Sequence, residues 1–225
     1  NRLVVGGADD KRTVYYSNTP VANESTSFAV GNVIRLDHDN GCHAAGTLND
    51  KLVLFTESAV YLVFGQFRDD TGAGDAVSPP ENLHNFIGCV QPISVWANPS
   101  GLMFFGTDNR FYMLTPELDL KPVGLAVQAW TAEQGYNIVR AVVDIPQERE
   151  VRFYMSNNKS GTICLVYNHL LNQWSRDVIT HPASGSAVTT WGGACYSNRL
   201  GVVVASPQGW MADTRNVWLD GSYYI

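Results

Sequence analysis

The chain repeats one pattern at an interval of about fifty residues. Five segments each contain an apolar run, a short polar turn and a second apolar run. The five first runs begin at positions separated by 49, 50, 49 and 49 residues, namely Arg2, Lys51, Gly101, Glu150 and Arg199. Self-similarity at this interval is typical of solenoids, propellers and arrays. The repeat therefore limits the fold to a series of similar units.

Each unit is rich in predicted β-strand. The apolar runs are four to eight residues long, contain many β-branched and aromatic residues, and are bounded by Asp, Asn, Gly and Ser. Turn signals separate the runs, as at 49–50, 107–109 and 156–158. The first runs at 52–55 and 102–105 are continuously apolar, which indicates strands buried on both faces.

Further strands flank each hairpin. One precedes it, at 42–48, 92–98, 137–145 and 186–196, and a more polar one follows it, at 32–36, 173–179 and 216–219. About four antiparallel strands in roughly fifty residues match a propeller blade. We therefore expect an all-β fold, a β-propeller of four-stranded antiparallel blades with about five repeats. Residues 1–225 form a single propeller domain or a fragment of one, with repeats starting near 2, 51, 101, 150 and 199.

The first repeat is shorter than the others. Residues 1–36 lack the strand that precedes each later hairpin, so the ring is expected to be incomplete within this piece of a longer polypeptide.

A β-sandwich is the main competing architecture, because it also contains short strands at regular intervals. Residues 125–135 depart from the pattern and predict a short helix, capped by Gly135, that bridges two blades.

Composition narrows the function classes. Of 225 residues, 45% are hydrophobic and 16% charged, and the net charge is −6 with no Lys/Arg run. A phosphate-binding surface needs clustered cations, so specific nucleic-acid binding is not expected. No apolar stretch is long enough to span a membrane. The four cysteines form no CxxC pair and are expected to be reduced, mostly buried thiols.

Few residues suggest chemistry. The five histidines show no metal-binding spacing. Asp69, Asp70 and Asp75 could ligate a hard cation such as calcium, but their spacing is not that of an EF-hand, and a solvated loop is the favoured interpretation. The long connection 68–85 is expected to contact a neighbouring subunit or a lumen. We expect no catalytic, cofactor-binding or metal-binding residue, and no enzyme activity.

Three tryptophans recur at an interval of 44 residues, at Trp130, Trp174 and Trp218. They are interpreted as equivalent wedges that pack between neighbouring blades, with a sugar-stacking platform as the functional alternative. Burial of an aromatic side chain stabilises a fold by roughly 1.5–3 kcal/mol, which favours packing.

Several segments resemble one protein family. NRLVVGG with TVYYSN (13–18), LNDKLVLFTESAVYLVFG (48–65) and the blade at 86–124 are similar to propeller segments of the tail nozzle, or tail tubular B-type, proteins of short-tailed bacteriophages. The resemblance covers roughly residues 2–220 and is carried by loose apolar patterns. The platform and nozzle-tip parts of that family are not visible in this chain.

The resemblance implies a structural component of a virion. Such proteins form hexameric rings below the portal and adaptor, near the tail fibres, and line a channel through which DNA leaves without specific binding. The expected location is the virion tail, assembled in the bacterial cytoplasm. The net negative charge of the chain suits a channel wall that does not bind the DNA phosphates. The alternatives are a carbohydrate- or receptor-binding, possibly hydrolytic, propeller of a tail-associated protein, and a cellular peptide-binding scaffold.

Overall fold

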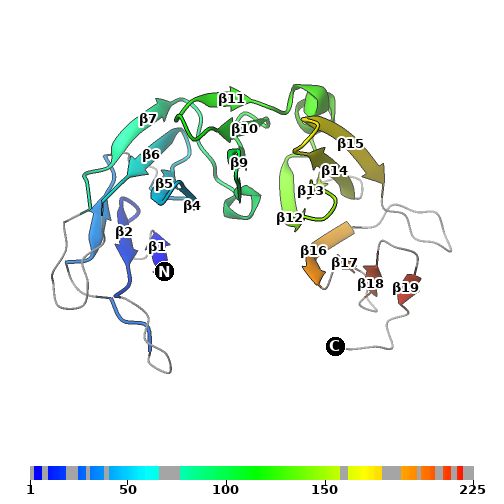
Figure 1. Cartoon of the computed structure of the whole chain (residues 1–225), viewed down its shortest axis with the longest axis horizontal. Helices are drawn as coiled ribbons and strands as arrows, with labels where there is room; N and C mark the ends of the chain where they lie inside the picture. Colours follow the sequence, from blue (N-terminus) through cyan, green and yellow to red (C-terminus); the bar gives the residue numbers. More distant parts are fainter. Residues whose placement is uncertain are drawn as a thin grey trace. The chain divides into compact units, whose positions relative to one another are not determined.

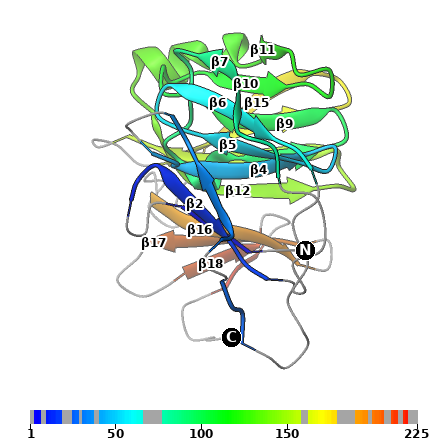
Figure 2. The same cartoon turned by 90° about the vertical axis from the view of Figure 1, so that its left-hand side faces the viewer.

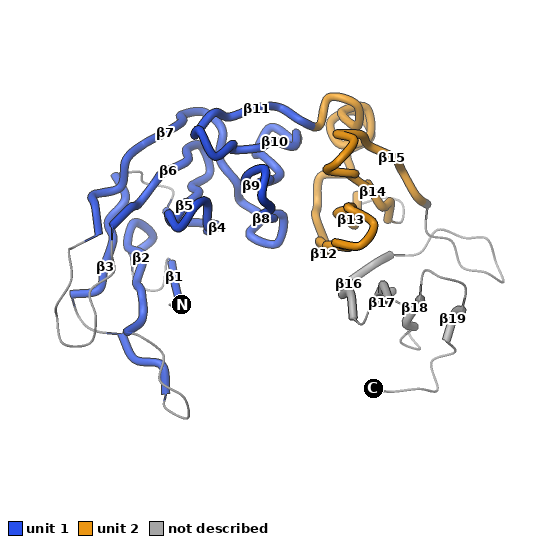
Figure 3. The backbone as a smooth tube through the Cα atoms, viewed as in Figure 1, with its two compact units in different colours: residues 1–123 blue, residues 124–225 orange. Residues whose placement is uncertain are grey.

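The chain is all-β in the computed structural model (Figure 1). Its described residues form one three-stranded and four four-stranded antiparallel sheets. They divide between two compact units, 1–123 and 124–225 (Figure 3). The structure describes residues 3–6, 10–18, 25–28, 31–37, 41–65, 77–157, 162–178, 189–196, 199–205, 210–213 and 217–219, with side chains up to Asp177.

The first unit holds three sheets, and in each of them the strands pair in chain order. Figure 2 shows β4 to β7 side by side in the second sheet. The first sheet contains β1 (Val4–Gly6), β2 (Thr13–Tyr16) and β3 (Val33–Arg35). The second contains β4 (Ala44–Leu48), β5 (Lys51–Phe55), β6 (Ala59–Val63) and β7 (Glu81–Asn85). The third contains β8 (Trp96–Asn98), β9 (Gly101–Phe105), β10 (Phe111–Leu114) and β11 (Leu120–Pro122).

The second unit holds two sheets with the same order of pairing. One contains β12 (Ile138–Ile145), β13 (Glu150–Ser156), β14 (Thr162–Asn168) and β15 (Gln173–Val178). The other contains β16 (Thr189–Tyr196), β17 (Arg199–Ala205), β18 (Trp210–Asp213) and β19 (Val217–Leu219). Five separate sheets are not the two facing sheets of a sandwich, so that competing architecture is wrong.

The repeated hairpins begin where the sequence places them. β5, β9, β13 and β17 start at the four residues predicted, and β1 starts two residues later than Arg2. The turn signals are also confirmed at 49–50, where Asn49 and Asp50 have φ angles of 48° and 61°. Two successive positive φ angles suit the right-handed twist of a two-residue hairpin, and Asn and Asp tolerate them better than most residues.

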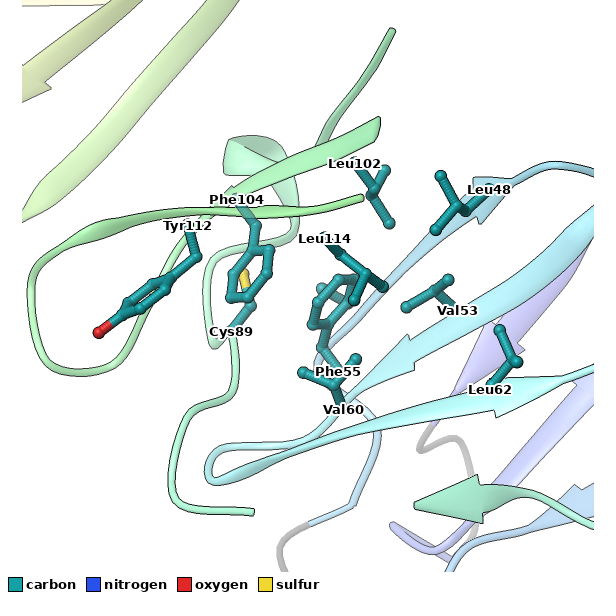
Figure 4. Packing of buried hydrophobic residues seen from close by; sticks show 11 residues of the cluster. Leu48, Val53, Phe55, Val60, Leu62, Cys89, Leu102, Phe104, Tyr112 and Leu114 are labelled. Carbon is teal, nitrogen blue, oxygen red and sulfur yellow. The ribbon is translucent and has the colours of Figure 1, made fainter. Parts of the chain in front are cut away.

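The sheets of the first unit pack face to face. Alternate residues of β5 and β6 point to opposite sides of the second sheet, and both sides are buried. One side meets the first sheet through Leu52, Leu54 and Tyr61. The other meets the third sheet, where Phe55 lies 4.7 Å from Phe104 between ring centroids (Figure 4). Burial on both faces explains why these strands are continuously apolar.

A Gly-Cys step joins each later sheet of the first unit to the preceding one. The amide of Cys42 donates to the carbonyl of Lys11 at 3.1 Å, and the amide of Cys89 donates to the carbonyl of Thr56 at 3.0 Å. Lys11 lies in the connection between β1 and β2, and Thr56 lies in the connection between β5 and β6, so each acceptor belongs to the central hairpin of the preceding sheet. A Cβ on Gly41 would lie 2.4 Å from the Lys11 carbonyl oxygen, and one on Gly88 would lie 2.0 Å from that of Thr56. The close approach therefore requires glycine at both steps.

The predicted helix at 125–135 is replaced by two different helical turns. Leu125–Val127 is a 3-10 turn and Ala129–Glu133 is a π-helical turn, closed by the Gln134 amide donating to the Ala129 carbonyl at 3.1 Å. Gly135 does end the segment with a positive φ of 72°. Helix-forming residues thus give helical turns here, but the segment is too short for a regular α-helix. No helix among the described residues is long and apolar enough to cross a membrane.

Candidate interaction surface

The outward face of the first sheet carries apolar side chains that the repeat buries elsewhere. By the repeat interval, Leu3 and Val5 correspond to Leu52 and Leu54 in the second sheet and to Leu102 and Phe104 in the third. The four later residues are at most 7% exposed, because each faces the preceding sheet. Leu3 is 51% and Val5 37% exposed. We call the surface formed by Leu3, Val5, Tyr15 and Val33 the open face.

Strand alternation places these residues together. Val4 packs toward the second sheet, so its neighbours Leu3 and Val5 point the opposite way. Val5 lies opposite Tyr15 on β2, and Tyr15 lies opposite Val33 on β3. Tyr15 and Val33 are half-buried. The open face is therefore a short cross-strand row of apolar side chains, of the kind that stabilises sheets by packing.

A tyrosine recurs at the same position of the central hairpin. In each of the three sheets of the first unit, this tyrosine lies opposite an apolar residue of the strand before it. The pairs are Val5 with Tyr15, Leu54 with Tyr61, and Phe104 with Tyr112. Tyr61 and Tyr112 are buried against the preceding sheet, and Tyr15 is not.

Burial alters the ionisation of the two covered tyrosines. Burial raises the pKa of Tyr61 above its usual value. Burial, together with a hydrogen bond to Asp108, raises the pKa of Tyr112 to about 12. The Tyr112 hydroxyl donates to Asp108 Oδ2 at 2.6 Å, and the Arg110 guanidinium lies 3.8 Å from the same oxygen. Tyr112 is thus fixed both by packing and by a charged acceptor at the rim of its sheet.

The second unit contains a compact ionic cluster. Arg152 lies 3.3 Å from Glu150, 3.6 Å from Glu148 and 3.7 Å from Asp177. Beside it on the same face are Tyr154 and Cys164, which lie opposite each other on β13 and β14. Burial raises the pKa of Cys164 to about 12 and also raises the pKa of Tyr154 above its usual value. Groups held protonated in this way are weak nucleophiles and weak acids at neutral pH.

Burial also affects the cysteine thiols. Cys42, Cys89 and Cys164 are free, as predicted, and the latter two are buried. Burial raises the pKa of Cys42 to about 11 and also raises that of Cys89. The Cys42 and Cys89 thiols donate to the carbonyls of Ala44 and Gln91, each at 3.4 Å. Cys42 and Cys89 also belong to the apolar clusters between the first and second and between the second and third sheets, respectively. Cys195 lies in β16, and its side chain is outside the described part.

The other candidates from the sequence are not brought together. The carboxylates Asp69, Asp70 and Asp75 lie outside the described residues, as do His38 and His181. His43 is exposed, His84 has Nε2 3.3 Å from the Leu118 carbonyl oxygen, and His169 lies in the β14–β15 turn. Within the described ranges, no group of three or more His, Cys, Asp or Glu residues could hold a metal ion.

Two sequence interpretations need correction. The connection predicted at 68–85 ends in strand β7, because Glu81–Asn85 pairs with β6.

The three tryptophans are not equivalent: Trp174 and Trp218 are the second residues of β15 and β19, whereas Trp130 lies in the π-helical turn. Trp174 contacts Tyr167 and Phe153 at 4.9 and 6.0 Å between ring centroids. Trp130 instead stacks under Arg176, whose guanidinium carbon lies 3.8 Å from the ring centroid.

The open face gave no signal of its own in the sequence. The sequence around Leu3 and Val5 has the same apolar pattern as the other first runs of the repeat. Only the structure shows that no described sheet packs against these two side chains. Comparison with known proteins adds nothing to this picture. No protein-family model matches the chain, and no curated protein is found to be similar to it.

Proposed function

We propose that the chain forms blades of a β-propeller that acts by shape, as a structural part of a short-tailed bacteriophage tail nozzle. The observation that carries the proposal is the open face. Apolar residues that the repeat buries between sheets are exposed on the first sheet, which suits a surface that receives another sheet of the same kind. Face-to-face packing of successive sheets in the first unit supports the propeller, and the resemblance to nozzle proteins supports the viral role.

The occupant of the open face is, by this proposal, another sheet of the repeat. The sheets that cover the corresponding residues present aliphatic side chains with one or two aromatics. The third sheet is covered by four such residues of the second sheet, Val53, Phe55, Val60 and Leu62. The second sheet is covered by three such residues of the first sheet, Val14, Tyr16 and Ile34. A partner surface with that composition would bury Leu3 and Val5 in the same way.

Ring assembly gives the first test. The nozzle proposal expects the protein to form hexamers, which sedimentation equilibrium would detect as a mass six times the 24.7 kDa of the chain. Antibodies against the chain should label the tail below the portal in electron micrographs of virions. Labelling elsewhere on the particle, or no labelling at all, would overturn the viral part of the proposal.

Matched substitutions test the open face. Val5→Glu should leave the fold intact, because Val5 is already partly exposed, but it should weaken association. Leu54→Glu, at the corresponding buried position, should unfold the chain. Equal effects of the two substitutions on stability would show that Val5 is not a free surface residue.

A carbohydrate- or receptor-binding propeller is the second candidate. Its support is the share of aromatic residues, 11%, and the exposed apolar side chains in the turns of the second unit, such as Leu170 and Leu171. A glycan array with the purified chain separates the candidates, because the nozzle proposal expects no retained glycan.

A further inference from the structure

Phe86, which follows β7, combines a strained backbone with an uncovered side chain. Its φ of 78° lies in the left-handed region, which is unfavourable for a bulky residue. Its side chain is 91% exposed, so packing within the described part of the chain does not offset that strain. Leu118 also has a positive φ, of 70°, but its side chain packs against the cluster between the second and third sheets. Phe86, in contrast, presents its ring to solvent.

Phe86 is one of four exposed apolar residues on the connection between β7 and β8. We call these residues the connection ridge: Phe86, Val90, Pro92 and Ile93. Two backbone hydrogen bonds fix this connection. The Cys89 amide donates to the Thr56 carbonyl at 3.0 Å, and the Gly88 carbonyl accepts from the Thr107 amide at 3.2 Å. A surface that is already rigid loses less conformational entropy on binding, so the connection ridge is suited to contact with a partner.

The repeat itself does not require apolar side chains at the connection ridge. Phe86 stands two residues before the glycine of the Gly-Cys step, and Val90 directly follows the cysteine. Asp39 and His43 hold these two positions in the connection before the second sheet. Polar residues are thus compatible with the same step. Exposed apolar side chains that gather in one place indicate an interaction surface.

The second unit presents another apolar surface, at the turn between β14 and β15. Leu170 and Leu171 are 64% and 60% exposed, and we call this pair the leucine turn. Their amides donate to Asn168 Oδ1 at 3.1 and 3.0 Å. The Tyr167 hydroxyl donates to Asn172 Oδ1 at 2.8 Å. These hydrogen bonds fix the leucine turn in the same way that backbone bonds fix the connection ridge.

Glu57 places a negative charge beside the connection ridge. It is exposed, and its carbonyl carbon lies 2.6 Å from the position that a Cβ on Gly88 would take. Asp108 lies in the next hairpin turn, but Arg110 is 3.8 Å from its carboxylate and offsets that charge. The connection ridge is therefore bordered by net negative charge.

Arg149 places a positive charge beside the leucine turn. It is exposed, and its carbonyl accepts from the His169 amide at 3.0 Å. Among the described residues, the nearby carboxylates of Glu148 and Glu150 are paired with Arg152, at 3.6 and 3.3 Å, and Arg149 has no such ion pair. A partner that brings a carboxylate to the leucine turn would therefore find Arg149 available.

We propose that the connection ridge of one copy of the chain packs on the leucine turn of a second copy. Phe86 is the aromatic anchor of this contact, and Glu57 opposite Arg149 orients it. A ridge that met its own counterpart would instead bring two Glu57 side chains together, which like charges oppose. Head-to-tail contacts close into rings when the rotation between copies permits. The inference rests on the association of copies in the proposed function and does not depend on the viral role.

Sedimentation velocity over a dilution series of the full chain tests the apolar contact. Phe86→Asn and Leu171→Asn should each weaken association by at least about tenfold, as truncation of an interface anchor does. Asn tolerates a left-handed backbone, so Phe86→Asn should keep or raise Tm, which separates lost contact from lost folding. Phe64→Asn is the matched control, because Phe64 is exposed outside the connection ridge, and it should leave association unchanged.

A charge swap tests the orientation of the two copies. Glu57→Lys and Arg149→Glu should each weaken association at low salt, and the double variant should recover it. A double variant that associates less than either single variant would overturn the head-to-tail arrangement. Hexamers that persist in Phe86→Asn would overturn this inference and leave the proposed ring in place. A wild-type chain that stays monomeric at every concentration would overturn both, and virions without tail labelling would overturn the viral role alone.

Discussion

Phe55 and Phe104 meet at the boundary between the second and third sheets, with ring centroids 4.7 Å apart and ring planes tilted by 51°. Both side chains are fully buried, and each belongs to the central hairpin of its sheet. The tilted arrangement is one that aromatic pairs prefer, because the edge of one ring meets the face of the other. This contact joins two repeats that are neighbours in the chain.

Removal of one ring should destabilise the protein strongly. We expect Phe104→Ala to lower the free energy of unfolding by about 3–5 kcal/mol, through lost transfer energy and a cavity. Urea denaturation followed by circular dichroism measures the change. Phe64→Ala is the control, since Phe64 is exposed, and it should cost far less. Equal losses in the two variants would contradict the packing described here.

The Gly-Cys step predicts a sharp intolerance at Gly88. A methyl group there would lie 2.0 Å from the Thr56 carbonyl oxygen, so Gly88→Ala must displace backbone. We expect a loss of at least 1–3 kcal/mol, roughly the cost of overpacking. Gly31→Ala is the matched control, because nothing beyond its adjacent residues lies within 4 Å of its Cβ position among the described residues. A Gly88→Ala protein with wild-type Tm would show that the close approach is wrong.

Arg176 and Trp130 should be energetically coupled. The guanidinium lies over the indole ring at 3.8 Å, and such cation–π contacts contribute about 0.5–1 kcal/mol at exposed sites. A double-mutant cycle with Arg176→Gln and Trp130→Leu, measured by urea denaturation, gives the coupling energy. Additive effects of the two substitutions would mean that the stacked geometry does not contribute to stability.

Alkaline pH should destabilise the fold through Tyr112. Its pKa is about 12 in the folded protein, because of burial and the hydrogen bond to Asp108, and about 10 in an unfolded chain. The unfolded state therefore loses its proton first as pH rises. The contribution of Tyr112 to stability is full below pH about 10 and is lost as pH rises through about 12.

Tyrosinate absorbance can isolate this group. The difference titration between the wild-type protein and Tyr112→Phe should show one group ionising near pH 12. Asp108→Asn removes the charge that opposes ionisation, so it should shift that step to lower pH. An unchanged step in Asp108→Asn would show that burial alone sets the pKa.

The central hairpins could be predicted from the sequence because their signals are strong. The runs at β5, β9, β13 and β17 are apolar, and turn residues such as Asn49-Asp50 bound them, so their starts agree with the structure. The outer strands β7 and β11 were missed. Glu81–Asn85 is largely polar and Leu120–Pro122 is short and contains proline, so neither has the alternation that marks a half-buried strand.

Other features depend on tertiary placement and had no local signal. Leu3 and Val5 look like buried residues in the sequence, and only the sheet order shows that nothing described covers them. The tryptophan interval suggested equivalence, but Trp130 lies in a helical turn and Trp174 in a strand. Regular spacing in a repeat protein therefore does not guarantee equivalent positions where the connections differ in length.

The Gly-Cys step also bears on how a chain of this kind can evolve. In the first unit, each incoming sheet is tied by one backbone hydrogen bond to the hairpin immediately before it, and its thiol and glycine contact nearest neighbours. A gene segment encoding one sheet with its leading Gly-Cys pair carries one half of each such junction, namely the close-packed glycine, the donating amide and the apolar face that packs on the preceding sheet. Duplication or deletion of such a segment would change the number of sheets while leaving every remaining junction intact.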